Sequence, residues 1–547
     1  MIEIDAHSTI GAALTAAAER WGDAEFVAVP PNPARSYHPA GYAIGYRSAQ
    51  AEVQRLMERY AARGYGHGQR VALLLDNRPE HLLHKLALNA LGACCVPMNP
   101  EYRAAETAYV VDHARPALLV TLGARLGAVE QALGLAAHRP ALATDEDFDT
   151  ALPAAAAAAR TDAPGPDTPA SILYTSGTTG RPKGCVLTHE YELLAGQAYA
   201  TRGGLATIRT GCERVYNPLP LYHVNASILS FFGMLLSGGC QIQGERFQPT
   251  RFWSEVRATR ASIVHYLGVV VPLLLAQPPS PQDRAHGVRF GWGAGVEPQL
   301  HALFEQRFGF PLVELWGMTE MVRLLSDCIE PRQVGTRAFG RAVPGVEVRV
   351  VDENDRDLPD GRPGELLIRH SAATPRRAFF AGYLDDPAAT EAAWRGGWFH
   401  TGDVVTRDAD GMLHFVDRRK NIVRRSGENI AAAEVEAVLL THAEVLQAAV
   451  LAVPDEIREE EVMACVVPKT MPADADAAAR LAQALQAHCL AHLAYFKAPG
   501  WLALRAELPT TGTQKIQKHA LFGPGVDARR AEGVIDLRAG KTRREAR

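Results

Sequence analysis

Short apolar runs that alternate with helical segments are the feature that most constrains the fold of this chain. Residues 71–75 and 117–121 have the composition of buried strands. Between them, 78–91 has the pattern of a helix, and Gly92 stands near its end. Strands separated by helices favour sheets that are covered by helices on both faces. The sequence therefore predicts an α/β fold, with doubly wound sheets in a large N-terminal region.

The chain is 547 residues long, which is more than one hydrophobic core usually serves, so at least two domains are expected. The residue pattern changes near Asp417, where a strand-like run is followed by charged residues. A helix-like segment at 431–440 and a strand-like segment at 447–453 come next. We place a hinge there. The predicted domains are 1–416 and a small, mobile α+β domain over 417–547, which is an ordinary domain size.

Composition and charge exclude several classes of function. Hydrophobic residues make up 47% of the chain and charged residues 22%, as in soluble globular proteins. A net charge of −4 gives no basic field for nucleic acid or an anionic membrane. The eight cysteines lack metal-binding spacing, which favours buried thiols in a reducing compartment. The N-terminus lacks a basic, apolar leader, and the longest apolar stretch, 264–276, is too short to span a bilayer. We expect a cytoplasmic protein.

A glycine-rich loop at 175–184 follows a strand-like segment, and its composition suits a polyphosphate. Glycines let the backbone turn sharply and present several N–H groups at one point, while hydroxyls and a lysine add donors and positive charge. The spacing is not that of a Walker loop. By composition alone, a flexible polar turn is the alternative. The residues that would contact the phosphates are Thr175, Ser176, Gly177, Thr178, Thr179, Gly180 and Lys183.

This loop resembles the signature loop of the adenylate-forming enzymes, which include acyl-CoA synthetases, luciferases and the adenylation domains of peptide synthetases. Further motifs follow in the order and spacing of that family, up to Lys518. Segments near 251–253, 277–280 and 415–419 look like the carnitine/crotonobetaine–CoA ligase branch. The resemblance implies ATP, Mg²⁺ and coenzyme A as cofactors. It also implies that 1–416 binds AMP and the acyl group, and that 417–547 is a lid that carries a catalytic lysine.

The segment 314–320 resembles the family motif that combines an aromatic residue with Thr-Glu. By this resemblance Glu320 binds magnesium, together with Thr175 from the loop, and Thr319 donates to the α-phosphate. Trp316 stands where tyrosine is usual, and its ring would lie against adenine. The remaining residues expected to wall the nucleotide are Gly293, Ala294, Gly295, Glu314, Leu315, Gly317 and Met318.

Four residues near or beyond the hinge have roles that the resemblance implies. Asp403 would accept hydrogen bonds from the ribose hydroxyls, and Arg418 would also reach the ribose. Gly427 would line the pantetheine tunnel after the lid rotates. Lys515 would lie between the acid and the α-phosphate and stabilise the developing charge. The match at this lysine is imperfect because Gln514 stands where glycine is usual, so nearby Lys518 is the alternative.

The acid itself is less defined by the sequence. His223 resembles the histidine that gates the acyl pocket, and the expected lining mixes polar and apolar residues, which favours a small or medium acid. Arg323 would either pair with a second carboxylate or face solvent. Carnitine is not implied. Two other functions stay open: adenylation with an amine, a carrier-protein thiol or another nucleophile as acceptor, and a nucleotide-binding relative without catalysis. Family habit alone suggests a homodimer.

Overall fold

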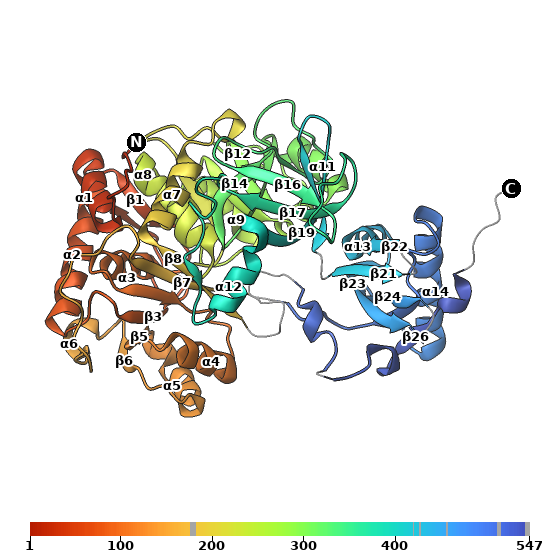
Figure 1. Ribbon diagram of the computed structural model, residues 1–547, viewed down its shortest axis with the longest axis horizontal. Helices are drawn as coiled ribbons and strands as arrows, with labels where there is room; N and C mark the ends of the chain where they lie inside the picture. The colour runs from red at the N-terminus through yellow and green to blue at the C-terminus, as the bar shows by residue number, and fades with distance from the viewer. Residues whose placement is uncertain are drawn as a thin grey trace. The chain divides into compact units, whose positions relative to one another are not determined.

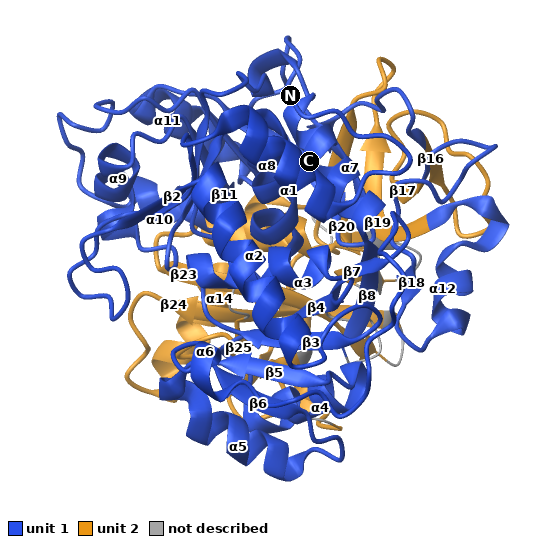
Figure 2. Ribbon diagram, turned by 90° about the vertical axis from the view of Figure 1, so that its left-hand side faces the viewer, with its two compact units in different colours: residues 1–347, 369–399 blue, residues 348–368, 400–547 orange. Residues whose placement is uncertain are grey.

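The structure is a computed structural model, and it describes residues 1–175, 182–418, 421–425, 428–455, 458–510, 516–523 and 525–541. The chain forms two compact units (Figures 1 and 2). The first unit contains Met1–Glu347 and Arg369–Phe399, and the second contains Val348–Ile368 and His400–Arg547. In the part of the chain that is described, no helix is long and apolar enough to cross a membrane. All eight cysteines are free, and seven of them are buried.

The first sheet of the first unit confirms the strands and the helix expected near the N-terminus. Five of its strands, β7 to β6 in spatial order, are parallel, and β8 and β18 extend one edge by two successive antiparallel pairings. In spatial order the strands are β18 (Gly382–Tyr383), β8 (Lys183–Thr188), β7 (Pro169–Thr175), β4 (Cys94–Pro97), β3 (Arg70–Leu74), β5 (Leu118–Thr121) and β6 (Ala141–Thr144). The helices that connect them are α3 (Pro79–Ala90), α4 (Ala104–Ala114), α5 (Leu126–Leu135) and α6 (Phe148–Ala151).

The second sheet of this unit has a parallel centre with an antiparallel strand at each edge. In spatial order its strands are β14 (Met321–Ser326), β13 (Leu312–Met318), β12 (Phe290–Ala294), β11 (Ile263–Leu267), β9 (Arg214–Asn217), β10 (Cys240–Gln243), β1 (Glu25–Val29) and β2 (Tyr42–Gly45). The helices of this part are α1 (Ile10–Trp21), α2 (Tyr46–Ala62), α7 (His189–Ala200), α8 (Phe231–Ser237), α9 (Pro249–Ala258), α10 (Val270–Leu275) and α11 (Pro298–Phe308), and α12 (Pro387–Ala393) lies in the later segment of the unit.

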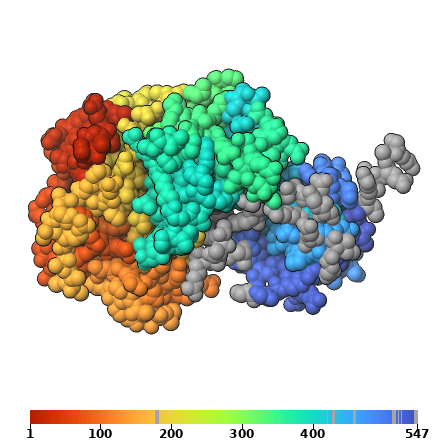
Figure 3. Space-filling view, in the orientation of Figure 1, coloured from red at the N-terminus to blue at the C-terminus, as the bar shows by residue number. Residues whose placement is uncertain are grey.

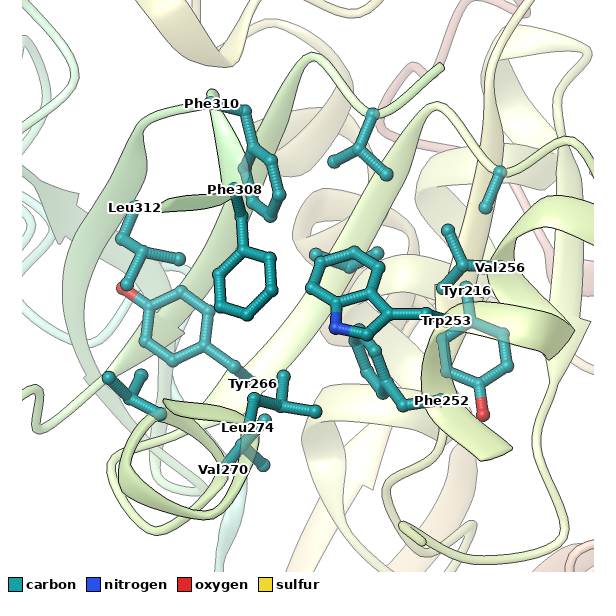
Figure 4. Packing of buried hydrophobic residues seen from close by; sticks show 14 of the residues in the cluster. Tyr216, Phe252, Trp253, Val256, Tyr266, Val270, Leu274, Phe308, Phe310 and Leu312 are labelled. Atoms are coloured by element: carbon teal, nitrogen blue, oxygen red, sulfur yellow. The ribbon is translucent and has the colours of Figure 1, made fainter. Parts of the chain in front are cut away.

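Aromatic side chains fill the core between this sheet and helices α9, α10 and α11. Trp253 of α9 lies 4.6 Å from Phe308 of α11, measured between ring centroids, and Phe310 packs beside them (Figure 4). Tyr266 of β11 belongs to the same cluster. Because its ring is held by this packing, its hydroxyl group has a fixed position at the far side of the cluster.

The second unit contains two sheets, and the more C-terminal one with its helices confirms the expected small α+β fold. The first sheet includes β20 (Leu413–Arg418), β19 (Phe399–Arg407), β17 (Gly364–Arg369) and β16 (Glu347–Val351). The other runs β22 (Glu428–Ala431), β21 (Ile422–Arg425), β24 (Glu459–Pro468), β25 (Trp501–Leu504) and β26 (Val534–Asp536), and β23 (Val445–Asp455) pairs with β24. Helices α13 (Ala432–Leu440) and α14 (Ala475–His492) complete its core.

Asp417 connects the two sheets of the second unit. Its side chain is buried, and its carboxylate accepts hydrogen bonds from the backbone N–H of Arg418 and from the backbone N–H of Ala433 at the start of α13. Residues 400–416 therefore group with the C-terminal part of the chain rather than with the first unit. The division of function at 416/417 and the hinge motion stay predictions.

A buried ion pair joins helices α3 and α7, which belong to the parts of the first unit built on its first and its second sheet. The Lys85 ammonium of α3 lies 2.7 Å from the carboxylate of Glu192 on α7, and both side chains are fully buried. Lys85 also donates to the hydroxyl of Ser171 on β7. The desolvation cost of two buried charges is offset only when both are present.

Replacement of Lys85 by methionine should destabilise the first unit by about 3–5 kcal/mol, because the Glu192 carboxylate would stay buried without its partner. The measurement is urea-induced unfolding followed by tryptophan fluorescence. The double variant Lys85→Met/Glu192→Leu is the control, and it should recover much of the lost stability. Equal destabilisation in the single and double variants would contradict this account.

Candidate active site

The β7–β8 hairpin fixes both ends of the glycine-rich loop. Thr175 is the last residue of β7 and pairs with Lys183, the first residue of β8. The five expected phosphate-binding residues between them, Ser176, Gly177, Thr178, Thr179 and Gly180, lie outside the described residues. The Lys183 ammonium lies 4.7 Å from the ring centroid of Tyr383 on β18. The lysine of the loop and its first threonine are thus held at one edge of the first sheet.

Thr319 and Glu320 form the turn between β13 and β14, and three hydrogen bonds from two segments hold that turn in place. Tyr383 donates a 2.9 Å hydrogen bond to the Glu320 carboxylate. The backbone N–H of Phe380 donates to the Glu320 carbonyl, and the hydroxyl of Tyr191 on α7 donates to the Thr319 carbonyl at 2.6 Å. The structure therefore brings Glu320 next to the residues at the base of the loop.

The surroundings of Glu320 fit a magnesium ligand. The Glu320 side chain is nearly buried. The burial of Tyr383 and the negative charge of Glu320 together raise the pKa of the Tyr383 phenol, so the phenol stays protonated and donates. Thr175 supplies a second hard oxygen, and its hydroxyl contacts Cys185, whose pKa is raised by burial and by Glu320. Among the described residues no group of three metal ligands is present. Magnesium bound to nucleotide uses one or two protein oxygens and phosphates, so Glu320 and Thr175 suffice.

Sequence reasoning did not identify Tyr383. Tyr383 lies outside the sequence motifs that identify the nucleotide site, and its contact with Glu320 spans 63 residues of chain. Only the pairing of β18 with β8 places its ring near Lys183 and Glu320.

Gly293, Ala294 and Gly295 form the end of β12 and the start of the loop that follows. A side chain on Gly293 would lie 2.2 Å from the Tyr266 carbonyl oxygen, and Gly295 has a φ of 86°, so both positions require glycine. Glu314 of β13 is nearly buried and supports this loop. Its carboxyl group accepts hydrogen bonds from the Tyr266 hydroxyl at 2.7 Å and from the Gly295 N–H at 2.9 Å.

Burial determines the charge of Glu314. Desolvation raises its pKa to about 7, although the hydrogen bonds from Tyr266 and Gly295 act in the opposite direction. The carboxyl group is engaged with the protein, which indicates that it shapes the wall of the expected nucleotide site. Leu315, Trp316, Gly317 and Met318 continue along β13, and the Trp316 ring packs 5.9 Å from the ring of Phe339.

A buried polar network includes Asn225, which follows His223 by two residues. His223 precedes a π-helical turn, η3 (Asn225–Ser230), and such turns are frequent at functional sites. The Asn225 amide oxygen lies 2.7 Å from Nδ1 of His265 and accepts from Asn217 at 2.9 Å. Burial lowers the pKa of His265 to about 3, so its ring is neutral. Asn217 and His265 were not expected from the sequence. Asn217 lies on β9, His265 on β11 and Asn225 in η3, so only the fold brings these three residues together.

In the second unit Asp403 and Arg418, which are both expected to reach the ribose, lie side by side. They face each other on β19 and β20, and Nε of Arg418 lies 2.7 Å from the Asp403 carboxylate. Asp403 is buried, whereas the Arg418 side chain is 44% exposed and can turn toward a ligand. Gly427 and Lys515 lie outside the described residues. The alternative lysine, Lys518, lies 2.7 Å from the Glu436 carboxylate of α13 and is therefore paired.

Glu314→Gln should flatten the dependence of stability on pH. The folded protein keeps a proton on this group up to about pH 7, while the unfolded chain releases it above about pH 4.5. As the pH rises from 4.5 to 7, wild-type protein should therefore lose up to about 3 kcal/mol more unfolding free energy than the variant. Urea unfolding at constant ionic strength across this range is the measurement. Parallel curves for the two proteins would contradict the raised pKa.

Comparison with known proteins places these residues in a family. The sequence model of the AMP-binding enzyme matches residues 14–384, and that of the AMP-binding enzyme C-terminal domain matches residues 434–515. A sulfoacetate–CoA ligase from Cupriavidus necator is 32% identical over 532 residues, which cover 95% of this chain and 98% of the relative. A crotonobetaine/carnitine–CoA ligase from Escherichia coli is 30% identical over 86% of this chain and 91% of its own.

Solved structures agree with the sequence comparison. ATP-bound MatB from Rhodopseudomonas palustris superposes with a TM-score of 0.78 at 25% identity, and the match covers 94% of this chain and 98% of that one. An o-succinylbenzoate coenzyme A synthetase from Bacillus subtilis, in complex with ATP and magnesium, has the same fold, with a TM-score of 0.77 at 22% identity. Since the first model alone matches more than half of the chain, the protein belongs to the AMP-binding enzyme family.

Proposed function

We propose that the protein is an ATP-dependent acid–CoA ligase. It activates a small or medium carboxylic acid as acyl-AMP with release of pyrophosphate, and it transfers the acyl group to coenzyme A with release of AMP. The observation that carries this proposal is the position of Glu320, held by Tyr383 at the base of the phosphate loop. Two CoA ligases among the relatives, each matched over at least 91% of its length, support the second half-reaction.

The first step needs two anions to approach each other. Lys183 and the loop that follows Thr175 would bind the triphosphate, and Glu320 with Thr175 would hold Mg²⁺, which neutralises phosphate charge when bound. A carboxylate oxygen of the acid then forms a bond to the α-phosphorus as the bond to pyrophosphate breaks. Lys515 would orient both reactants and stabilise the charge on the α-phosphate.

The second step replaces AMP by a thiolate. The coenzyme A thiol releases its proton to solvent, its sulfur forms a bond to the acyl carbon, and the bond from that carbon to the AMP oxygen breaks, so that AMP leaves as an anion. Asp403 would hold the ribose of the nucleotide throughout, and Arg418 would exchange its contact with Asp403 for one with the ribose. We propose that Lys515 leaves the site between the steps and that the Gly427 loop then lines the thiol's path.

The substrate is proposed only by size and polarity. Asn217 and His265 hydrogen-bond to Asn225, which follows His223 by two residues in the expected acyl pocket. A polar residue at that position suits a short acid better than a long alkyl chain. The relatives are named for sulfoacetate and for crotonobetaine or carnitine, and these small acids carry a second charged group. A cytoplasmic location is proposed from the free, mostly buried cysteines, and a homodimer stays a prediction.

AMP release with ATP, Mg²⁺ and a panel of acids, each with and without coenzyme A, tests the proposal. CoA-dependent AMP release with formation of the acyl thioester is the expected result. Release of pyrophosphate that is independent of coenzyme A would favour an amine or carrier-protein acceptor. Nucleotide binding without any turnover across the panel would favour the relative without catalysis.

Lys515→Ala should reduce adenylate formation at least about 100-fold, because the charge on the α-phosphate would lose its stabilising cation. Lys518→Ala is the matched control, since Lys518 is already paired with Glu436, and it should keep most of the activity. Pyrophosphate exchange into ATP in the presence of the acid measures this step alone. The opposite ranking of the two variants would move the catalytic role to Lys518.

Tyr383→Phe should raise the Mg²⁺ concentration needed for half-maximal rate by about tenfold. The variant removes one hydrogen bond to a charged group and leaves the carboxylate less well oriented, a loss on the order of 1.4 kcal/mol. Tyr174→Phe is the control, because the Tyr174 hydroxyl bonds to His113 instead. An unchanged Mg²⁺ requirement in Tyr383→Phe would show that Glu320 does not depend on this bond.

A further inference from the structure

Three arginines and one histidine of the first unit gather around one point of strand β14. Arg323 lies on β14, Arg202 follows the end of α7, and His370 and Arg377 belong to the segment before β18. None of the three arginines has an acidic partner among the residues that the structure describes. The six residues of this unit outside that set, 176–181, contain no aspartate or glutamate. The cluster therefore carries positive charge that the unit does not compensate.

Direct contacts place Arg323 and His370 side by side. Nη1 of Arg323 donates to the Pro344 carbonyl at 3.2 Å. A Cβ atom on Gly345 would lie 2.8 Å from that Nη1 and 3.4 Å from Nε2 of His370, so both groups face the same glycine. Gly345 has a φ of 78° and no side chain, and these two properties let the guanidinium and the imidazole approach this turn.

Partial burial makes this concentration of charge costly. Arg202, Arg323 and His370 are half-buried, and Nε of Arg202 is buried without a hydrogen-bond partner in the described structure. Burial lowers the pKa of Arg202, and the charge of neighbouring Arg323 lowers it further. Burial also lowers the pKa of Arg323, and the charge of neighbouring Arg377 lowers it further. Glu347 is the acid that faces His370, and it already pairs with Arg369 at 2.7 Å. An anion bound here would offset this repulsion.

The cluster is built on the elements that hold the proposed magnesium ligand. Met321 and Phe379 form a bridge, with Glu320 bonded to Phe380 on one side and Val322 bonded to Ala378 on the other. The segment that carries Arg377 is therefore fixed against β14, and Figure 3 shows it in teal at the surface of the first unit. Arg323 lies three residues beyond Glu320, which is at most about 10 Å of extended chain. An arginine side chain and a short acid together span such a distance.

We propose that Arg323, with Arg202, Arg377 and His370, binds the second anionic group of a short dianionic acid, a sulfonate or a second carboxylate. This inference rests on the proposed ligase function and narrows its substrate class. Guanidinium groups match the oxygens of both anions with paired N–H donors. The carboxylate that reacts lies toward Glu320, and the second anion lies toward Arg323. The site selects against acids with a neutral end, because the cationic cluster would then stay uncompensated.

Matched acids test the selectivity. Sulfoacetate and malonate should react with at least about 100-fold higher kcat/KM than propionate, which has a similar length and a neutral end, since one charged pair in a half-buried site is worth about two powers of ten. The readout is CoA-dependent AMP release at constant ionic strength. Equal kcat/KM for dianionic and monoanionic acids would overturn the proposal.

Variants of Arg323 locate the effect. Arg323→Met should raise KM for the dianionic acid about 100-fold, leave kcat within a few-fold, and leave propionate unchanged or improved. Arg323→Lys should recover part of the loss, because it keeps the charge but not the paired donors. Arg376→Met is the control from the same segment, since Arg376 is paired with Glu391 at 2.6 Å and should have no effect on either acid class. Equal losses with both acid classes in Arg323→Met would overturn the assignment.

Two further measurements separate this proposal from the ligase activity and from coenzyme A. Calorimetric titration of the full-length protein with sulfoacetate and with malonate, in the absence of ATP, should show binding that Arg323→Met weakens at least tenfold and Arg376→Met does not. This result would support the anion site even if no acid were turned over. If Arg323→Met instead raised KM for coenzyme A and spared the acid, the cluster would serve a coenzyme A phosphate and the proposal would be wrong.

Discussion

The bonds around Glu320 are the constraint on which the candidate site depends. Glu320 lies where β14, the edge strand of the second sheet, begins, and Tyr383 lies on β18, the edge strand of the first sheet. The Tyr383–Glu320 hydrogen bond and the Met321–Phe379 bridge therefore join the edges of the two sheets. A nearly buried carboxylate requires hydrogen-bond donors, and meeting that requirement holds the expected metal ligand near Lys183, at one end of the phosphate loop.

Buried and half-buried charged groups of the first unit differ in what compensates their charge. Lys85 and Glu192 neutralise each other in a fully buried pair. Glu314 is held by the Tyr266 hydroxyl, and burial raises its pKa toward neutrality. Arg323 has no acidic partner among the described residues of the unit, and its guanidinium donates only to the Pro344 carbonyl there. A protein core rarely keeps uncompensated charge without a ligand that uses it, and this contrast sets the arginine cluster apart from structural ion pairs.

The second unit contributes a different kind of positioning. Asp417 is buried and bonded to both Arg418 and Ala433, which ties strand β20 to the first turn of α13. Asp403 and Arg418 face each other on adjacent strands, so the groups expected to reach the ribose are held by sheet pairing. Lys515, expected between the acid and the α-phosphate, and Gly427, expected to line the pantetheine tunnel, belong to the same unit but lie outside the described residues.

The sequence by itself determined the alternation of strands and helices and the family, because short apolar runs and contiguous motifs are local patterns. It also named Glu320, Asp403 and Arg418 as candidate site residues, since each stands within such a motif. Only the tertiary structure decided which residues support them. Tyr383 reaches Glu320 across 63 residues, His265 reaches Asn225 across 40, and Arg202 and Arg377 come together only where α7 and a later segment meet β14. These contacts depend on sheet order and on burial, and neither is encoded in the spacing of neighbouring residues.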